Sequence, residues 1–443
     1  MLGVLAVTLS LQAADWPRLG GPEEIGVSPE TGLARSWPET GPKIRWTVDV
    51  GEGYAGPAIS GDEVFLLDRV PDVEDVLRCF DLEKGNEKWH ASWKAPGTLA
   101  NNNGSRNVPT VDGDRVYALG PRGALKCVDR HTGKILWAAH LVEDFKDPQI
   151  DVLEPAKTRD EKLLRAQVPL WGLTQAPLIY KNSVIVAPQT QKTGVVAYDK
   201  KNGKLLWRSG YVGRNWYSHV SPCLARFCGV DQVVLLAQPS DPEKTPREAP
   251  PALITSIDPT TGSILWTNQT PCPYKIPIPQ PLPIGNDRLF ITGGYGMGSM
   301  MLQITHNSNQ WQTKLLFHNS VAASHIHSPI LYKDRIYVTS FKEHGAEKTG
   351  LVCMDTNGAG LWQTGPTHQF DNGGFLVADG MIYIMNGKTG MLSLYELGGE
   401  QPRLLSSAKI LDAENGNVWA PLALSNGHLL VRDQHQVKCL DVR

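Results

Sequence analysis

The chain has 443 residues, and its 43 basic and 45 acidic side chains leave a formal charge of −2. Length alone would suggest two or three ordinary domains. No Lys/Arg-rich run is present, so the sequence excludes the basic footprint of a nucleic-acid partner. The 43 Gly, 32 Pro and 13 Trp favour short strands joined by many turns.

Residues 1–14 (MLGVLAVTLSLQAA) form an apolar run that ends in small residues, as a secretory signal peptide does. The run lacks a basic start, and the alternative is a buried N-terminal strand or helix. No other apolar run approaches the ~20 residues that span a bilayer. We therefore expect an exported protein, periplasmic or secreted, that is peripheral to a membrane at most.

Residues 15–42 are rich in Pro and Gly and have no hydrophobic period, which predicts an extended arm on the protein surface. Residues 43–50 (KIRWTVDV) read as a strand that carries Trp46. No partner strand precedes it. The chain ends in another strand-like run, 437–441 (VKCLD), which lacks a following Trp strand. The N-terminal strand is therefore predicted to pair with the C-terminal one.

An eleven-residue frame recurs along the chain. It consists of a small residue, a hydrophobic residue, Asp, a polar turn with Gly, and a hydrophobic run that ends in Trp. The copies are 79–89 (CFDLEKGNEKW), 127–137 (CVDRHTGKILW), 197–207 (AYDKKNGKLLW), 256–266 (SIDPTTGSILW) and the shorter 353–362 (CMDTNGAGLW). Each reads as a hairpin whose Asp and Gly build the turn. One hairpin cannot bury its own Trp, so the copies must stack on one another, as in a propeller or a solenoid.

The frame resembles the tryptophan-docking motif of pyrroloquinoline-quinone-type β-propellers, a group that includes quinoprotein alcohol dehydrogenases and BamB-type outer-membrane assembly factors. The resemblance extends from about residue 41 to the end of the chain. It implies a docking role for Asp81, Trp89, Asp129, Gly133, Trp137, Asp199, Gly203, Trp207, Asp258, Gly262, Trp266, Asp355, Trp362 and Trp46. Two further copies are decayed: 302–311 keeps only its Trp, and 394–405 has Leu in place of Trp.

Eight blade starts follow one another, each with a turn residue and apolar residues. They are 56–59, 108–111, 176–179, 221–224, 280–283, 328–331, 374–377 and 420–423. The predicted fold is all-β: a single propeller over residues 43–443 with eight four-stranded blades, closed by the N-terminal strand in the last blade. Seven blades is the alternative.

Four of the seven cysteines occupy the first position of the frame, where other copies have Ala or Ser, so we interpret this position as a small buried slot. Cys223 and Cys228 leave room for one disulfide bridge in an oxidising compartment.

The innermost strands of a propeller begin around one mouth of the central channel, so residues just before the blade starts are predicted to converge there. Aromatic and polar side chains at these positions are typical of a ligand pocket; the alternative is that they merely close the channel. The predicted binding residues are Tyr54, Arg106, Trp171, Trp216, His219, His325, His327 and Trp419. The three histidines are compatible with zinc or copper, but the neighbouring sequence supplies no further ligands, and we expect no metal site.

The function predicted first is an exported, non-catalytic scaffold that binds a protein, peptide or glycan at the rim of the channel, without a cofactor. The resemblance also allows a dehydrogenase that uses pyrroloquinoline quinone and Ca²⁺. For that alternative, the adjacent Asp371 and Asn372 would be the catalytic carboxylate and its amide partner. A third interpretation is a module that binds a sugar or another small molecule with its aromatic residues.

Overall fold

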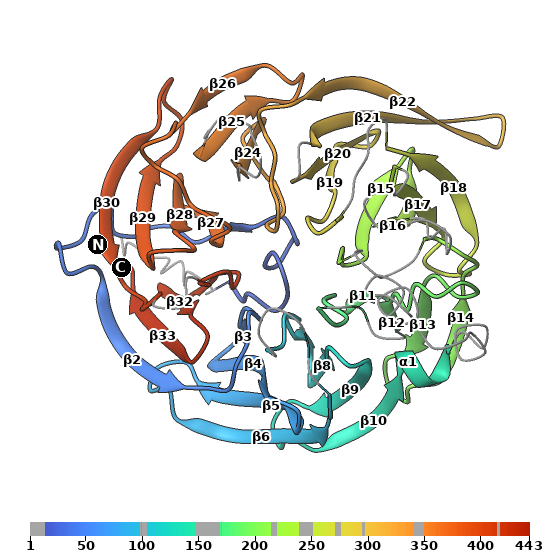
Figure 1. Cartoon of the computed structure of the whole chain (residues 1–443), viewed down its shortest axis with the longest axis horizontal. Coiled ribbons are helices and arrows are strands. Elements are labelled where there is room, and N and C mark those ends of the chain that lie inside the picture. The colour runs from blue at the N-terminus through green and yellow to red at the C-terminus, as the bar shows by residue number, and fades with distance from the viewer. Residues whose placement is uncertain are drawn as a thin grey trace, which may run out of the picture.

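The computed structural model places the strands in eight sheets around a central axis, as Figure 1 shows. It describes residues 14–97, 99, 104–146, 169, 171–213, 219–238, 251–270, 276–294, 297–340, 350–413 and 417–443. Within these residues each sheet is one blade, and neighbouring strands in a blade are consecutive in sequence except for the two strands, β1 (Val27–Ser28) and β2 (Lys43–Asp49), that the N-terminal segment adds. The all-β, eight-bladed propeller predicted from the repeats is confirmed.

The strands of the first four blades, numbered in chain order, run from the channel outwards. Blade 1 is β3 (Ala58–Ser60), β4 (Glu63–Val70), β5 (Glu74–Asp81) and β6 (Glu87–Lys94); blade 2 is β7 (Thr110–Asp112), β8 (Arg115–Leu119), β9 (Ala124–Asp129) and β10 (Ile135–His140); blade 3 is β11 (Leu178–Tyr180), β12 (Ser183–Val186), β13 (Val196–Asp199) and β14 (Leu205–Arg208); blade 4 is β15 (Cys223–Phe227), β16 (Val230–Ala237), β17 (Leu253–Ile257) and β18 (Ile264–Gln269).

The remaining blades follow the same order, apart from the additions from the N-terminal segment. Blade 5 is β19 (Leu282–Ile284), β20 (Arg288–Gly293), β21 (Gly298–Asn307) and β22 (Gln310–Asn319); blade 6 is β23 (Ile330–Tyr332), β24 (Arg335–Ser340), β25 (Gly350–Asp355) and β26 (Gly360–Gln363); blade 7 is β27 (Phe375–Ala378), β28 (Met381–Met385), β29 (Met391–Glu396) and β30 (Arg403–Lys409), with β1 (Val27–Ser28) inside it; blade 8 is β31 (Ala423–Ser425), β32 (His428–Arg432), β33 (Gln436–Asp441) and β2 (Lys43–Asp49).

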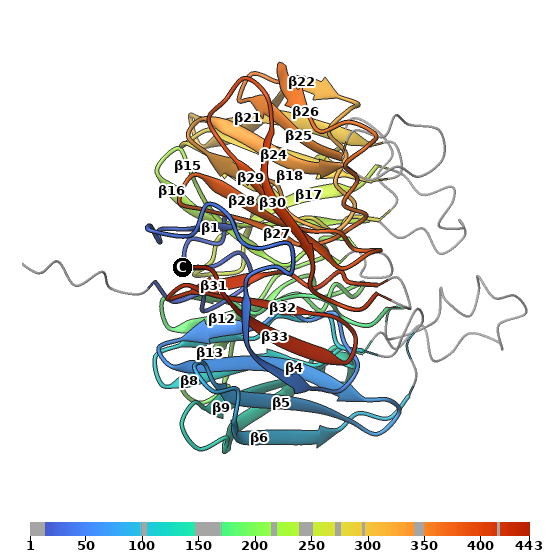
Figure 2. The same ribbon diagram turned by 90° about the vertical axis from the view of Figure 1, so that its left-hand side faces the viewer.

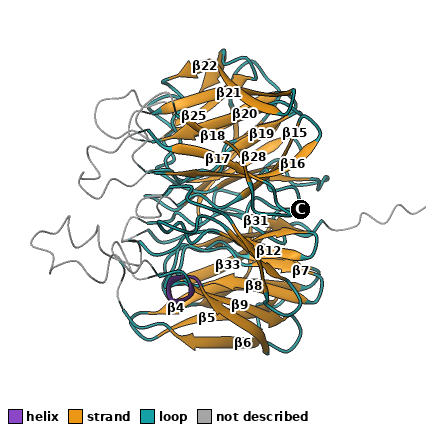
Figure 3. Cartoon of the chain, turned by 90° about the vertical axis from the view of Figure 1, so that its right-hand side faces the viewer, coloured by secondary structure: helices purple, strands orange, loops and turns teal. Residues whose placement is uncertain are grey.

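Helical structure is scarce in the described part of the chain. The helix α1 (Leu141–Asp144) follows β10, and His140 caps its first turn by accepting the backbone N–H of Glu143. Figure 3 shows this helix as a single purple turn among the orange strands. No helix among the described residues is long and apolar enough to cross a membrane.

The ring closes through the N-terminal strand. Strand β2 pairs antiparallel with β33, and Trp46 lies opposite Cys439 in this ladder. Blade 8 therefore combines strands from both ends of the chain, which leaves no open sheet edge between the first and last blades. The predicted closure is confirmed.

The hydrophobic core lies between the blades. In β4, Val64 and Leu66 pack in a cluster with residues of blade 8, whereas Phe65 and Leu67 pack in a cluster with residues of blade 2. Because alternate side chains of a strand point to opposite faces, both faces of the inner strands are buried and their sequences are apolar almost throughout.

The docking motif joins blade 8 to blade 1 and the first four blades to one another. Asp129 Oδ1 accepts the backbone N–H groups of His131 and Thr132 and thereby fixes the turn between β9 and β10. The indole N–H of Trp137 donates to the backbone carbonyl of Lys200 in blade 3, at 3.1 Å. The same bond joins Trp46 to Leu82, Trp89 to Arg130 and Trp207 to Pro259. In all four cases the acceptor is the residue directly after the Asp of the next blade.

The Trp ring of one blade packs against the Gly of the motif in the next blade. Gly203 has a φ of +73°, and a Cβ atom at this position would lie 2.7 Å from Trp137 Cδ2. Gly is therefore required both by the left-handed backbone and by the close approach of the indole.

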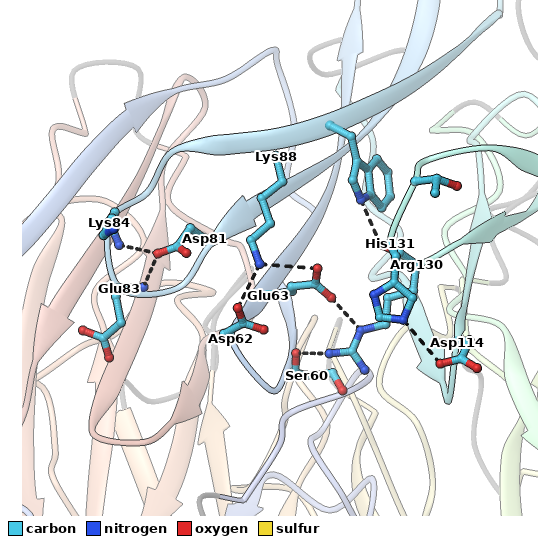
Figure 4. A network of polar contacts seen from close by, with 12 residues as sticks. Ser60, Asp62, Glu63, Asp81, Glu83, Lys84, Lys88, Asp114, Arg130 and His131 are labelled. Atoms are coloured by element: carbon cyan, nitrogen blue, oxygen red, sulfur yellow. Dashed lines mark hydrogen bonds and ion pairs between the residues drawn. The ribbon is translucent and has the colours of Figure 1, made fainter.

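Charged side chains reinforce the contact between blades 1 and 2, as Figure 4 shows. The Arg130 guanidinium donates to Glu63 Oε2 and to the carbonyl of Ser60, both at 2.6 Å. Lys88 lies 3.0 Å from Asp62 and 3.4 Å from Glu63. The carbonyl of Arg130 also accepts the indole N–H of Trp89.

Docking differs around blade 5, whose frame is decayed. Trp266 of blade 4 donates to Gln232 Oε1 of its own blade, because blade 5 offers no turn of the docking type. Trp311, the Trp that this decayed copy keeps, does not dock on the next blade. The ring of Trp311 stacks on that of His306, with 4.1 Å between the ring centroids. Phe317 instead packs against Gly358 of blade 6, where an added Cβ atom would lie 2.7 Å from the Phe317 ring.

The cysteines in the frame lie in small buried slots, as predicted. Cys79, Cys127, Cys353 and Cys439 have no exposed surface. Burial raises the pKa of the Cys79 thiol to about 12, so it stays protonated.

Cys223 and Cys228 are free thiols, so the bridge that the sequence left open is not formed. Cys223 begins β15 and Cys228 follows the end of this strand. Five residues of extended chain separate the two Cα atoms by roughly 16 Å, and a disulfide requires less than about 7 Å.

The N-terminal arm lies along the end of the channel where β3 turns into β4. Asp15 accepts bonds from Ser60 Oγ and from the Gly61 backbone N–H in this turn. Further along, β1 pairs in parallel with β27 of blade 7. Figure 2 shows β1 at one edge of the disc in side view. The predicted signal peptide (1–14) lies almost entirely outside the described residues.

Candidate functional site

Residues that precede the innermost strands surround a cavity of 290 Å³ near the axis, here called the central cavity. Seven of the eight blades contribute to its wall, and the N-terminal arm adds Leu19. The described residues that line it are Leu19, Tyr54, Arg106, Trp171, Thr174, His219, Ser221, Ile276, Ile278, Gln280, His325, Ile326, His327, Ser328, Trp419 and Pro421.

One side of the central cavity is aromatic and carries a positive charge. The rings of Tyr54 and Trp419 stack, with 5.4 Å between their centroids and 25° between their planes. The Arg106 guanidinium lies over the Tyr54 ring, 4.9 Å from its centroid, and its Nη1 donates to the carbonyls of Gly104 (3.1 Å) and Trp171 (3.2 Å). Burial lowers the pKa of Arg106 to about 10, so the side chain keeps its charge at neutral pH.

His219 forms another part of the wall and is uncharged. Its ring lies 5.3 Å from that of Trp171, and its Nδ1 is 2.8 Å from the Thr174 hydroxyl. Only 5% of His219 is exposed. Burial lowers its pKa to about 3, and the nearby Arg106 and His325 contribute to the shift. The other ring nitrogen, Nε2, is buried and has no hydrogen-bond partner among the described residues.

His325 and His327 are held by Asn372, which lies just before blade 7. His327 Nε2–H donates to the Asn372 carbonyl at 2.9 Å, and Asn372 Nδ2 lies 3.4 Å from His325 Nδ1. Burial lowers the pKa of each histidine to about 4, although the bonds to Asn372 oppose the shift. All three histidines of the central cavity are therefore neutral at pH 7.

The proposed carboxylate–amide pair does not fit a Ca²⁺ site in this arrangement. The Asp371 carboxylate pairs with Lys388 Nζ at 3.1 Å, and Asp371 is not part of the cavity wall. The side-chain nitrogen Nδ2 of Asn372 faces His325, and the backbone carbonyl of Asn372 accepts the N–H of His327. No group of three or more His, Cys, Asp or Glu residues that could hold a metal ion occurs among the described residues. A quinone with its Ca²⁺ would therefore need ligands other than Asp371 and Asn372.

Seven of the eight predicted binding residues meet in the central cavity; Trp216 lies outside the described residues. Sequence reasoning missed several others in the wall: Leu19, Thr174, Ser221, Gln280, Ser328, Ile276, Ile278, Ile326 and Pro421. Gln280 and Ser328 each precede the Pro of a blade start, a signal that could have identified them. Leu19 comes from the arm, and nothing in its local sequence marks it.

Comparison with known proteins identifies the family. The family model for the outer membrane protein assembly factor BamB matches residues 27–152, 73–240 and 250–401, which is well over half of the chain. No curated protein matches the sequence.

Among solved structures, BamB from Moraxella catarrhalis is similar, with a TM-score of 0.56 and 13% identity over 90% of this chain and 96% of that one. A quinohemoprotein alcohol dehydrogenase from Comamonas testosteroni gives a TM-score of 0.61 with 13% identity over 97% and 80% of the two chains. A europium-containing methanol dehydrogenase gives 0.65 with 12% identity over 96% and 89%. Identities this low establish the shared fold and leave function to the residues of the site. On the strength of the family match, the chain belongs to the BamB family of pyrroloquinoline-quinone-like β-propellers.

Proposed function

We propose that this protein is an exported, non-catalytic scaffold that binds a segment of a partner protein, with a side chain of that segment inserted in the central cavity. The observation that carries the proposal is the convergence of aromatic, apolar and polar residues from seven blades on one cavity, with Arg106 as its charged member. Buried aromatic rings beside a few polar groups are typical of the pockets that anchor binding partners.

The chemistry of the wall favours binding over catalysis of alcohol oxidation. Removal of a proton from an alcohol needs a base within hydrogen-bond reach of the substrate. No carboxylate is present among the described residues of the wall. Burial lowers the pKa of His219 to about 3 and that of His325 and His327 to about 4, which makes all three weak bases. The family match supports a protein partner and an exported location, because the matching family is an outer-membrane assembly factor.

The size of the cavity favours one inserted side chain. Pockets for whole small molecules usually measure about 300–1,000 Å³. At 290 Å³ the central cavity is at the lower limit of this range. Most of a bound segment would therefore lie on the rim, and one residue would reach between Tyr54 and Trp171.

The proposal can be tested by selecting peptides from a random displayed library on the purified chain. Dissociation constants are then measured on two variants of Ile326, which lines the cavity. Ile326→Trp fills the cavity and should weaken selected peptides at least ten-fold, whereas Ile326→Ala should retain binding. Leu206→Ala, on the exposed face of β14, is the surface control. Equal binding to all variants would contradict the proposal, and selective binding of neutral oligosaccharides in place of peptides would favour the sugar-binding alternative.

A further inference from the structure

His219 Nε2 points to a hydrogen-bonding group that the ligand must supply. His219 is 5% exposed and lines the central cavity, and no residue in the described part of the chain bonds to this nitrogen. An unsatisfied buried polar atom destabilises a fold, so its presence in a native structure calls for an explanation. A ligand atom that bonds to Nε2 would provide one.

The contact with Thr174 is compatible with a proton on His219 Nε2. The Thr174 hydroxyl is 2.8 Å from His219 Nδ1 and 3.4 Å from the His219 carbonyl. At 2.8 Å the hydroxyl can donate to Nδ1, and the single proton of the neutral ring is then on Nε2. A hydrogen-bond acceptor on the ligand selects this tautomer, because it makes Nε2 a donor.

The surroundings of this donor favour an anion. Arg106 carries a permanent charge in the same wall, and its field reaches His219, whose pKa it lowers. None of the described residues of the wall is acidic. A carboxylate accepts hydrogen bonds and has no proton to give, so it matches a donor beside a cation better than a hydroxyl or an amide does.

We propose that the central cavity recognises a carboxylate of the partner segment, which accepts a hydrogen bond from His219 Nε2–H within the field of Arg106. The inference rests on the proposed function, since it names the group that the bound segment inserts. The carboxylate has two sources, an Asp or Glu side chain or the C-terminus of the partner.

The test compares peptide pools with the same degenerate positions. One pool ends in a free carboxylate, a second ends in an amide, and a third ends in an amide but carries a central Glu, with Gln in its matched control. Binding is measured by fluorescence anisotropy on the wild type. We expect one of the two acidic pools to bind at least about ten-fold more tightly than its neutral control, as for a charge-assisted bond. The pool that does so identifies the source.

Two variants separate His219 from the rest of the surface. His219→Phe keeps a flat ring against Trp171 and removes Nε2, so it should abolish most of the preference for the acidic pool. His306→Gln, on strand β21 and outside the wall of the central cavity, should leave the preference unchanged. If neutral and acidic pools bind the wild type equally, the carboxylate inference fails while the proposed function stands. If no pool binds but acidic sugars do, the proposed function itself fails.

Discussion

Replacement of His219 by Phe should stabilise the protein, which is unusual for a change at a well-packed position. The wild type leaves Nε2 buried without a partner, at a cost of about 1–3 kcal/mol. Phe removes this cost but loses the bond between Nδ1 and Thr174, worth about 0.5–1.5 kcal/mol. The free energy of unfolding should therefore rise by about 1 kcal/mol at pH 7.5.

The stability that His219→Phe gains over the wild type should grow as the pH falls. The pKa of His219 is about 3 in the folded protein, against an ordinary value of 6.5 for a histidine side chain. Unfolded chains therefore bind a proton that folded chains exclude, and stability is lost as the pH falls from about 6.5 toward 3. Each such histidine contributes about 1.4 kcal/mol per pH unit in this window. His219→Phe removes one such histidine, so the free energy of unfolding of this variant should exceed that of the wild type by about 3 kcal/mol at pH 5.

Urea denaturation of wild type, His219→Phe and the control His306→Gln at pH 7.5, 6 and 5 measures both effects. Subtracting the free energy of unfolding of the wild type from that of each variant cancels the contribution of carboxylates that titrate equally in all three proteins. A variant that is less stable than the wild type by more than about 1 kcal/mol at pH 7.5 would refute the reasoning. A difference in free energy of unfolding between His219→Phe and the wild type that stays constant from pH 7.5 to 5 would also refute it, because His219 would then not be a neutral buried base.

Three further predictions concern the fold. Trp137→Ala removes a docking ring and its bond to the next blade and should lower the free energy of unfolding by about 3–5 kcal/mol in urea denaturation; a loss below about 1 kcal/mol would contradict the docking role. Gly203→Ala should lower the thermal midpoint because its φ is +73° and its Cβ would meet the Trp137 ring, whereas Gly210→Ala, with the nearest atom at 4.0 Å, should not. Peptide mapping after alkylation without reductant should find Cys223 and Cys228 as separate labelled thiols, and a cross-linked peptide would show the described geometry of β15 to be incorrect.

The sequence was sufficient for the architecture because the same physical problem recurs in each blade. A Trp that must be buried, an Asp that fixes a turn and a Gly that accommodates the ring leave a pattern in every intact copy. Blade 5 shows the limit of this reasoning. Its docking ring is Phe317, and a search for Trp selects Trp311, which stacks on His306 instead.

The site could be located from the sequence because position along a blade determines which residues reach the axis. The chemistry of the site could not be predicted from the sequence. The orphan nitrogen of His219 depends on Thr174 and Trp171, 45 and 48 residues away, and the pairing of Asp371 with Lys388 depends on the fold of blade 7. Such contacts between loops leave no local pattern, and they decide which side chains face the cavity and which are occupied.

The most direct test of the account is the affinity of a selected peptide for the wild type and for Ile326→Trp, measured by isothermal titration calorimetry. The account predicts that the filled cavity weakens binding at least ten-fold while the thermal midpoint of the protein stays within the range of the Ile326→Ala control. Unchanged affinity for a folded Ile326→Trp protein would contradict the claim that the partner inserts a side chain in the central cavity.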